Sequence, residues 1–214
     1  MAAMNRQVLL ASRPHGPVTE DNFRIVDAPT GEPGAGEVLV RNEWLSLDPY
    51  MRGRMNDVKS YVPPVQIGEV MVGQTVGEVV ASRDPRFAAG DKVLASSGWQ
   101  LYGVAKAEEV YRIDATPAPA SYYLGVLGMP GMTAWFGLFD IGAPKSGETV
   151  VVSAASGAVG SVVGQLAKIL GCYPVIVPGE SGVLSALGFI ASEIKNEFSQ
   201  TFVKTIATTT PDAV

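Results

Sequence analysis

The segment from residue 150 to 164, VVVSAASGAVGSVVG, constrains the fold of this chain more than any other. Its apolar run is typical of a buried strand, and the small residues that follow predict a tight turn that leads into a helix. A strand, turn and helix of this kind can hold the pyrophosphate of a dinucleotide, because the helix N-terminus offers free N–H groups. A connection whose small residues only allow close packing gives the same pattern, so the motif alone leaves both interpretations open.

The glycines of this segment have distinct expected roles, although alanine stands where the first glycine of G-x-G-x-x-G belongs. Gly157 lies where the backbone must approach phosphates without a Cβ, and Gly160 lies where the helix must press against the strand. We expect Gly164 to extend this small face by one turn, because positions i, i+3 and i+7 share a helix face. Ser161 adds a hydroxyl donor.

The remainder of the chain divides into two patterns. Residues 1 to about 125 contain short apolar or alternating runs between turn signals, such as QVLLAS, FRIVDAP, GEVLVRNEWLSL and DKVLASSGWQLYGVAK, and these predict a β-barrel or sandwich. The stretch YYLGVLGMPGMTAWFGLFDIGAP predicts two helices separated at Pro130 and Gly131. A helix from residue 158, closed by Gly171, and a second parallel strand in YPVIV complete the pattern.

Composition excludes several classes of partner and site. The net charge of −5 gives no basic face for nucleic acid. The single cysteine, Cys172, forms no disulfide within the chain and fits a reducing, cytoplasmic compartment. With one histidine, His15, the chain also lacks the ligands of a cysteine–histidine zinc site. Residues 149–167 are uncharged, but serines, a glutamine and small residues favour a buried strand–turn–helix over a membrane span.

Three segments in order and spacing carry a family resemblance: LSLDPYMRGRM (45–55), LGMPGMTAWFGL (127–138) and VVVSAASGAVGSVVGQLAKILG (150–171). Together they resemble the zinc-independent medium-chain dehydrogenase/reductases, in the branch of the NADPH-dependent enone and 2-alkenal reductases. The resemblance covers about residues 4 to 172. The loop of that family is A-x-x-G-x-x-G, which Ala154, Gly157 and Gly160 satisfy.

The resemblance implies a β plus α/β architecture. Residues 1–125 would form a GroES-like β-barrel catalytic domain, and residues 126–172 would begin a Rossmann domain, a doubly wound parallel sheet that binds NADP. The active site would lie in the cleft between them. The reaction would be hydride transfer from NADPH to the β-carbon of a small α,β-unsaturated ketone or aldehyde, without metal. Intact members of that family are often dimers, so the resemblance implies a homodimer if the Rossmann domain is complete.

The resemblance also implies roles for individual residues. Tyr50 matches a tyrosine that lies at the substrate, where it would orient the carbonyl or donate a proton; alternatively, its ring closes the turn after Pro49. Arg52 and Trp99 are candidate substrate contacts, and each is also explained as a solvated or packing residue. The expected cofactor-binding residues are Met129 and Thr133 beside the nicotinamide and Ala154, Gly157, Ala158, Val159, Gly160 and Ser161 in the loop.

After Cys172 the family pattern stops, and residues 173–214 are expected to be an atypical tail on a truncated Rossmann domain. Glu180 lies where an NAD-selecting acid would be read, but the segment YPVIVPGESGVLSALGFIASEIKNEFSQTF resembles part of the hydantoinase A/oxoprolinase family. A fusion and a diverged Rossmann tail are the two explanations. The functional hypotheses are therefore an enone reductase, a non-catalytic remnant or interaction module with a vestigial nucleotide loop, and a hydantoinase-type hydrolase fragment.

Overall fold

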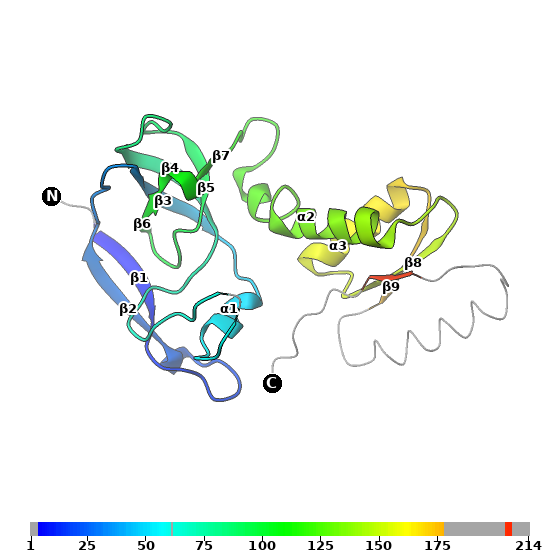
Figure 1. The fold of residues 1–214 in the computed structure, drawn as a ribbon, viewed down its shortest axis with the longest axis horizontal. Helices are drawn as coiled ribbons and strands as arrows, with labels where there is room; N and C mark the ends of the chain where they lie inside the picture. Colours follow the sequence, from blue (N-terminus) through cyan, green and yellow to red (C-terminus); the bar gives the residue numbers. More distant parts are fainter. Residues whose placement is uncertain (1–3, 61, 178–203, 207–214) are drawn as a thin grey trace. The chain divides into compact units, whose positions relative to one another are not determined.

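The computed structural model describes residues 4–60, 62–177 and 204–206. These residues belong to two units, the first extending to Leu124 and the second beginning at Gly125, and each is described by itself (Figure 1). Glu180 and most of the hydantoinase-like segment lie outside the described residues.

The strands of the first unit confirm the β-rich pattern expected for its sequence. They are β1 (Met4–Leu10), β2 (Phe23–Pro29), β3 (Glu37–Leu45), β4 (Thr75–Ser82), β5 (Lys92–Ala95), β6 (Tyr102–Lys106) and β7 (Tyr111–Arg112). Strands β1 and β2 form an antiparallel pair, and the others form an antiparallel sheet in the order β6-β3-β4-β5-β7. The run DKVLASSGWQLYGVAK supplies two strands, β5 and β6, which are not neighbours in that sheet.

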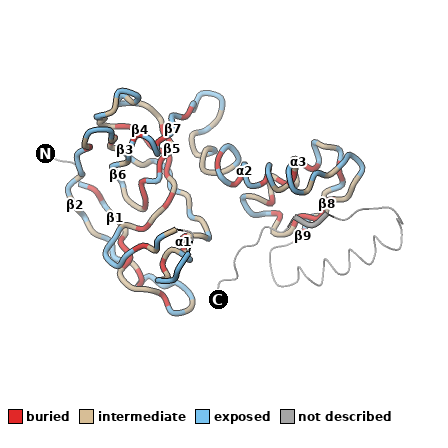
Figure 2. The backbone as a smooth tube through the Cα atoms, viewed as in Figure 1, coloured by how far each residue is buried: buried red, intermediate tan, exposed pale blue. Residues whose placement is uncertain are grey.

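Alternation along the strands builds the core of the first unit. Val38 and Val40 of β3 point the same way because side chains alternate between the faces of a strand, and both are fully buried. They pack with Val79 of β4 and Val93 of β5 in one apolar cluster. Figure 2 shows the same strands as stretches of buried and less buried backbone.

A buried amide ties the first strand to a distant part of the sheet. The side chain of Asn5 donates to the carbonyl oxygen of Tyr102 at 2.8 Å and accepts from the Tyr102 N–H at 2.9 Å. It also donates to Oε1 of Gln100 at 3.0 Å, and Gln7 donates to the same oxygen at 2.7 Å. Because a buried amide is costly unless it is paired, these bonds fix β1 against residues 100–102.

The second unit contains a parallel sheet around strand β8 (Thr149–Ser153). Its order is β10-β8-β9, where β9 is Tyr173–Val177 and β10 is Lys204–Ile206. The second parallel strand predicted in YPVIV is thus confirmed, and the sheet continues beyond Cys172. The valines of β8, residues 150–152, are all buried, as expected for a strand covered on both faces.

Helix α3 (Ala158–Ile169) follows the glycine-rich turn and ends as predicted at Gly171. Gly171 has a φ of +77°, a left-handed conformation that favours glycine. Its N–H donates to the carbonyl of Lys168, and the N–H of Cys172 donates to the carbonyl of Ala167. This pair of bonds is a Schellman ending, which satisfies the last helix carbonyls and turns the chain into β9.

The helical segment before β8 differs from the prediction of two helices separated at Pro130 and Gly131. A short 3₁₀ helix, η3 (Ala120–Leu124), comes first, and Pro130 and Gly131 then lie in the first turn of α2 (Met129–Trp135). Proline is tolerated there because the N–H that it lacks would have no helical acceptor. The chain continues directly into η4 (Phe136–Gly142), a π-helical segment.

Cys172 lies in the core of the second unit. Its side chain is buried, and Sγ donates to the carbonyl oxygen of Lys145 at 3.3 Å. Burial, with a contribution from Glu148, raises the pKa of the Cys172 thiol. A buried and protonated thiol is a poor nucleophile, so this residue serves packing.

Within residues 4–60 and 62–177, no helix is long and apolar enough to cross a membrane. The same residues contain no group of three or more histidine, cysteine or acidic side chains placed to hold a metal ion.

Candidate functional site

The N-terminus of α3 lies at the end of β8, as the strand–turn–helix prediction requires. Gly157 is the residue before the helix and has extended backbone, and no side chain in the described part of the chain caps this end. The N–H groups of Ala158, Val159 and Gly160 belong to the first turn, where no helical carbonyl precedes them. They are therefore available to an anion.

Close approach explains the glycine at position 160. A Cβ on Gly160 would lie 2.4 Å from the carbonyl oxygen of Ala154 and 2.8 Å from the Cα of Ala155. Such distances are far below van der Waals contact, so only glycine lets the helix lie this close to the turn. The loop is further tightened by the Gly157 N–H, which donates to the Ala154 carbonyl at 2.8 Å.

The expected extension of this small face to Gly164 is wrong. A Cβ on Gly164 would meet no atom within 4 Å, so close packing does not require glycine at this position. The hydroxyl of Ser161 is placed in the first turn, but it donates to the carbonyl of Ala158 at 3.4 Å. Of the loop positions, Gly160 therefore has the strongest steric requirement.

The first residue of the A-x-x-G-x-x-G pattern adopts an uncommon backbone conformation. Ala154 has a φ of +49°, in the left-handed region that residues with a Cβ seldom occupy. The following N–H, of Ala155, donates to the carbonyl of Val177 at the end of β9 at 3.4 Å. Strained backbone held by its surroundings is typical of ligand-binding loops.

Met129 and Thr133 lie one turn apart on α2, in the same unit as the loop. Both are exposed, and the Thr133 hydroxyl donates to the Met129 carbonyl at 2.8 Å. The opposite face of α2 packs on α3 through Ala134, in a core that includes Val163 and Ala167. Their exposure leaves both predicted residues accessible to a ligand.

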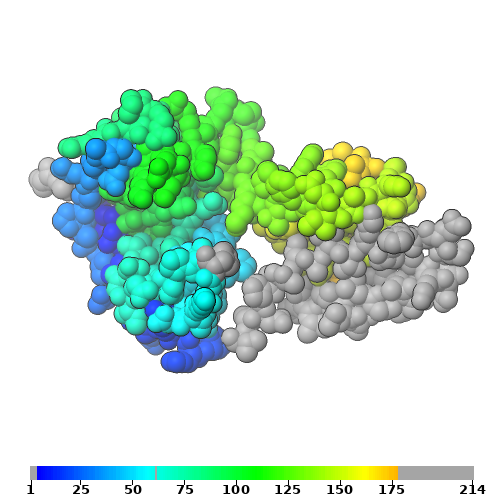
Figure 3. Space-filling view, viewed as in Figure 1, coloured from blue at the N-terminus to red at the C-terminus, as the bar shows by residue number. Residues whose placement is uncertain are grey.

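Tyr50 and Arg52 lie on α1 (Tyr50–Arg54), a short helix of the first unit. Tyr50 is half-buried. The Arg52 guanidinium donates to Oδ1 of Asn56 at 2.7 Å and to the carbonyl oxygen of Gly16 at 2.9 Å, so Arg52 holds a loop as well as facing a cavity. In Figure 3 the cyan residues that include α1 lie on the surface of the first unit.

Arg52 and Trp99 meet at a cavity of about 320 Å³ beside α1, whereas Tyr50 is not among its lining residues. Trp99 stacks on Phe23 with ring centroids 5.5 Å apart. The other lining residues are Val18, Leu47, Asp48, Pro49, Met51, Met55 and Met71. We call this space the α1 cavity.

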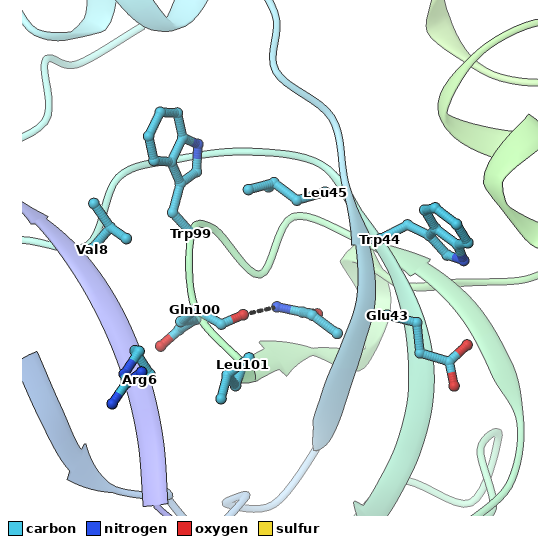
Figure 4. A pocket seen from close by; sticks show the side chains of 9 residues that line it. Arg6, Val8, Glu43, Trp44, Leu45, Trp99, Gln100 and Leu101 are labelled. Carbon is cyan, nitrogen blue, oxygen red and sulfur yellow. Dashed lines mark hydrogen bonds between the residues drawn. The ribbon is translucent and has the colours of Figure 1, made fainter. Parts of the chain in front are cut away.

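Trp99 also lines a second hollow, of about 300 Å³, on the side of β3. Figure 4 shows Trp99 and Trp44 on either side of Leu45, with the Gln100 backbone oxygen accepting a 2.8 Å bond from Asn42. Trp44 is exposed and adds an apolar surface to this hollow, whose lining also includes the charged residues Arg6 and Glu43.

Sequence reasoning missed most of the α1 cavity. Met51 and Met55 were detectable in principle, because residues four apart in DPYMRGRM share a helix face. Phe23 and Met71 come from distant positions and are placed there only by the fold. The loop residues, by contrast, are contiguous and were proposed from the A-x-x-G-x-x-G pattern.

Comparisons with known proteins agree with this architecture. Residues 6–113 match a family described as the N-terminal domain of oxidoreductase. The chain is 54% identical over 175 residues to an NADPH-dependent curcumin reductase of Escherichia coli (strain K12), covering 82% of this chain and 51% of that protein. It is 44% identical over 176 residues to an NADP⁺-dependent 2-alkenal reductase of Nicotiana tabacum, covering 80% and 51%.

A solved structure shares the fold. The crystal structure of CurA from Vibrio vulnificus in complex with NADPH has a TM-score of 0.76 and 44% sequence identity, covering 97% of this chain and 59% of that one. The chain spans about half the length of the curated relatives that it matches.

Proposed function

Because the chain belongs to the zinc-independent medium-chain dehydrogenase/reductases, in the enone and 2-alkenal reductase branch, we propose that it functions as an NADPH-dependent double-bond reductase. Its first unit is a GroES-like domain and its second begins a Rossmann domain. The reaction would be reduction of the carbon–carbon double bond of a small α,β-unsaturated ketone or aldehyde.

The observation that carries the proposal is the close approach at Gly160, since a Cβ there would fill the cradle between turn and helix. The residues present fit a dinucleotide pyrophosphate: the first-turn N–H groups of Ala158, Val159 and Gly160 would hold it. Ala154 and Gly157 would shape the turn, and Ser161 would lie beside it. Met129 and Thr133 would border the nicotinamide.

When bound, NADPH supplies the hydride. The chain must then stabilise the negative charge that develops on the carbonyl oxygen and the neighbouring carbon. We assign this to Tyr50, whose hydroxyl would donate a hydrogen bond to the carbonyl oxygen or a proton to the enolate. Trp99 and Arg52 would act as substrate-contacting walls of the α1 cavity.

Titration of the purified chain with NADPH tests the proposal. We expect enhanced nicotinamide fluorescence, a higher unfolding temperature with cofactor, and turnover of a simple 2-alkenal. The second hypothesis, a non-catalytic protein with a vestigial loop, predicts no change at millimolar NADPH. That result would overturn the reductase proposal.

We further propose that the complete protein is a homodimer and is cytoplasmic. A homodimer would give twice the monomer mass in sedimentation equilibrium. A cytoplasmic location would place the chain in the soluble fraction of fractionated cells. Binding of nucleic acid or membrane is not expected for a chain of net charge −5.

A further inference from the structure

The α1 cavity is lined only by residues of the first unit. These residues lie between positions 18 and 99, so none of them belongs to the unit that contains the glycine-rich loop. Val18 and Leu47 of the lining are exposed to solvent, whereas Met51, Met55 and Met71 are nearly fully buried. The lining therefore runs from the surface into the core of the first unit.

The charges of the lining disfavour an anionic ligand. Asp48 and Arg52 are the two charged residues of the lining, and the others are apolar or aromatic. The Arg52 guanidinium already donates to Oδ1 of Asn56 at 2.7 Å and to the carbonyl oxygen of Gly16 at 2.9 Å. An anion would lose hydration there without gaining an uncommitted cation, whereas a neutral apolar group gains free energy when it leaves water.

The volume of the cavity sets the size of that group. An apolar protein cavity of about 150 Å³ binds one benzene ring. The α1 cavity has about 320 Å³, so it has room for two fused rings. Phe23 and Trp99 stack with ring centroids 5.5 Å apart, and methionine sulfur makes favourable contacts with aromatic rings. The lining therefore suits an aromatic group.

We propose that the α1 cavity is an apolar subsite that binds an aromatic group of up to two fused rings, and that it does so without cofactor. The inference rests on the proposed function only for the identity of the ligand, a ketone or aldehyde whose non-reacting end carries the rings. Pro49 and Met51 line the cavity and flank Tyr50 in the chain. The subsite thus lies at the same short helix as the residue assigned to the carbonyl oxygen.

A series of saturated ketones tests the subsite on the natural chain, because these ligands have no enone double bond to reduce. The series is butan-2-one, 4-phenylbutan-2-one, 4-(2-naphthyl)butan-2-one and 4-(2-anthryl)butan-2-one. Without NADPH, the affinity should rise at least about ten-fold with each of the first two rings. It should not rise with the third ring, which exceeds the volume of the cavity. A continued rise with the third ring, or no rise with the first two, overturns the proposal.

Methionine signals report where the ketone binds. Met51, Met55 and Met71 line the cavity, whereas Met4 and Met132 are exposed and lie outside it. With ¹³C-methyl methionine, the ring current of 4-(2-naphthyl)butan-2-one should shift the signals of the lining methionines and leave the exposed pair in place. M51L, M55L and M71L assign these signals, because leucine conserves the side-chain volume. A shift at the exposed pair without a shift at the lining methionines overturns the proposal.

A matched pair of variants fills the cavity from its exposed side. Val18 is 39% exposed and lines the cavity, whereas Val58 is 60% exposed and does not. V18W should weaken binding of the naphthyl ketone about ten-fold, because the indole takes up space that one ring would occupy. V58W should leave the affinity unchanged. Both substitutions are at exposed positions, so both variants should fold, and equal affinity in the two overturns the proposal.

An amine tests whether Asp48 instead makes this a cation site. 2-(2-Naphthyl)ethylamine carries the same rings on an ammonium group. It should bind less tightly than the naphthyl ketone, because the ammonium loses hydration beside an apolar lining. Tighter binding of the amine would assign the cavity to a cation and overturn the proposal.

Turnover of 4-(2-naphthyl)but-3-en-2-one with NADPH separates this inference from the proposed function. Reduction of that enone without ketone-induced shifts at the lining methionines would overturn the subsite and leave the reductase. Shifts at these methionines without any reduction would support the subsite and contradict the reductase.

Discussion

Gly160 faces the Ala154 carbonyl so closely that a Cβ at position 160 would lie 2.4 Å from that oxygen. Gly164, one turn along the same helix, has no atom within 4 Å of an added Cβ. G160A should therefore abolish NADPH binding by displacing the turn, and G164A should retain it. G164A should also stabilise the chain by up to about 1 kcal/mol, because alanine is the better helix former. Cofactor titration and urea unfolding of both variants measure these effects; equal NADPH affinity in both contradicts the cradle.

Substitution of Gly171 and of Gly147 separates the stability cost of left-handed backbone from the cost of a steric contact. Both have positive φ, +77° and +85°, but a Cβ on Gly171 would also lie 2.6 Å from Oγ of Ser146. G147A should cost about 1 kcal/mol from backbone strain alone. G171A should cost more, because Ser146 must also move. Urea unfolding of the two variants gives the difference, and an equal cost would show that the serine moves freely.

Tyr50 is assigned to the carbonyl oxygen, so removal of its hydroxyl should slow the reaction without weakening the cofactor. We expect Y50F to lower kcat by about 100-fold or more, with an unchanged Kd for NADPH. Y122F removes the hydroxyl of an exposed tyrosine and serves as the control. A Y50F variant with full kcat would restrict Tyr50 to a packing role.

Arg52 joins α1 to the carbonyl oxygen of Gly16, 36 positions earlier in the chain. R52A should lower the free energy of unfolding by about 1–3 kcal/mol, because it removes two bonds from a charged donor. N56A removes only the bond at Asn56 and should cost less. Unfolding curves of the two variants measure the difference. A larger loss for R52A than for N56A would show that the bond to Gly16 contributes to stability, and equal losses would show that it does not.

The pH dependence of stability should reflect the ion pair between Lys92 and Glu78, whose Nζ and Oε2 atoms lie 3.1 Å apart. The bond from Lys92, with smaller contributions from Arg41, lowers the pKa of Glu78 below its ordinary value of 4.5. Its contribution to stability is therefore present above about pH 4.5 and is lost as pH falls through the lower folded-state pKa. K92M should flatten the acid side of the stability profile, measured as urea midpoints between about pH 3 and 7. An unchanged profile would show that the pair is too exposed to matter.

Local patterns were predictable, and long-range juxtapositions were not. The alternation in β3 and the glycine ending of α3 follow from short stretches of sequence, and both are confirmed. Pro130 was misread because proline occurs both where a helix breaks and where a helix begins. In the first turn of α2 it costs no helical hydrogen bond, because the N–H groups of a first turn have no helical acceptor. Gly164 was misread because helix periodicity does not say whether a neighbouring element lies against a given position.

The same limit applies to the candidate site. The loop residues are contiguous, so a motif finds them. The α1 cavity depends on Phe23 stacking on Trp99, which lie 76 positions apart by their numbers. Unsatisfied atoms such as Asp48 Oδ2 are visible only when every neighbour has been placed.

The reciprocal bonds between Asn5 and Tyr102 set an order of events during synthesis. Strand β1 is synthesised before Tyr102, the partner of Asn5 that lies 97 positions later. Until then, the β1–β2 hairpin has an amide that only water can satisfy on the side that will be buried. The first unit should thus close late, in a single step when residues 100–102 have emerged, and a nascent chain stalled before that point should remain sensitive to protease.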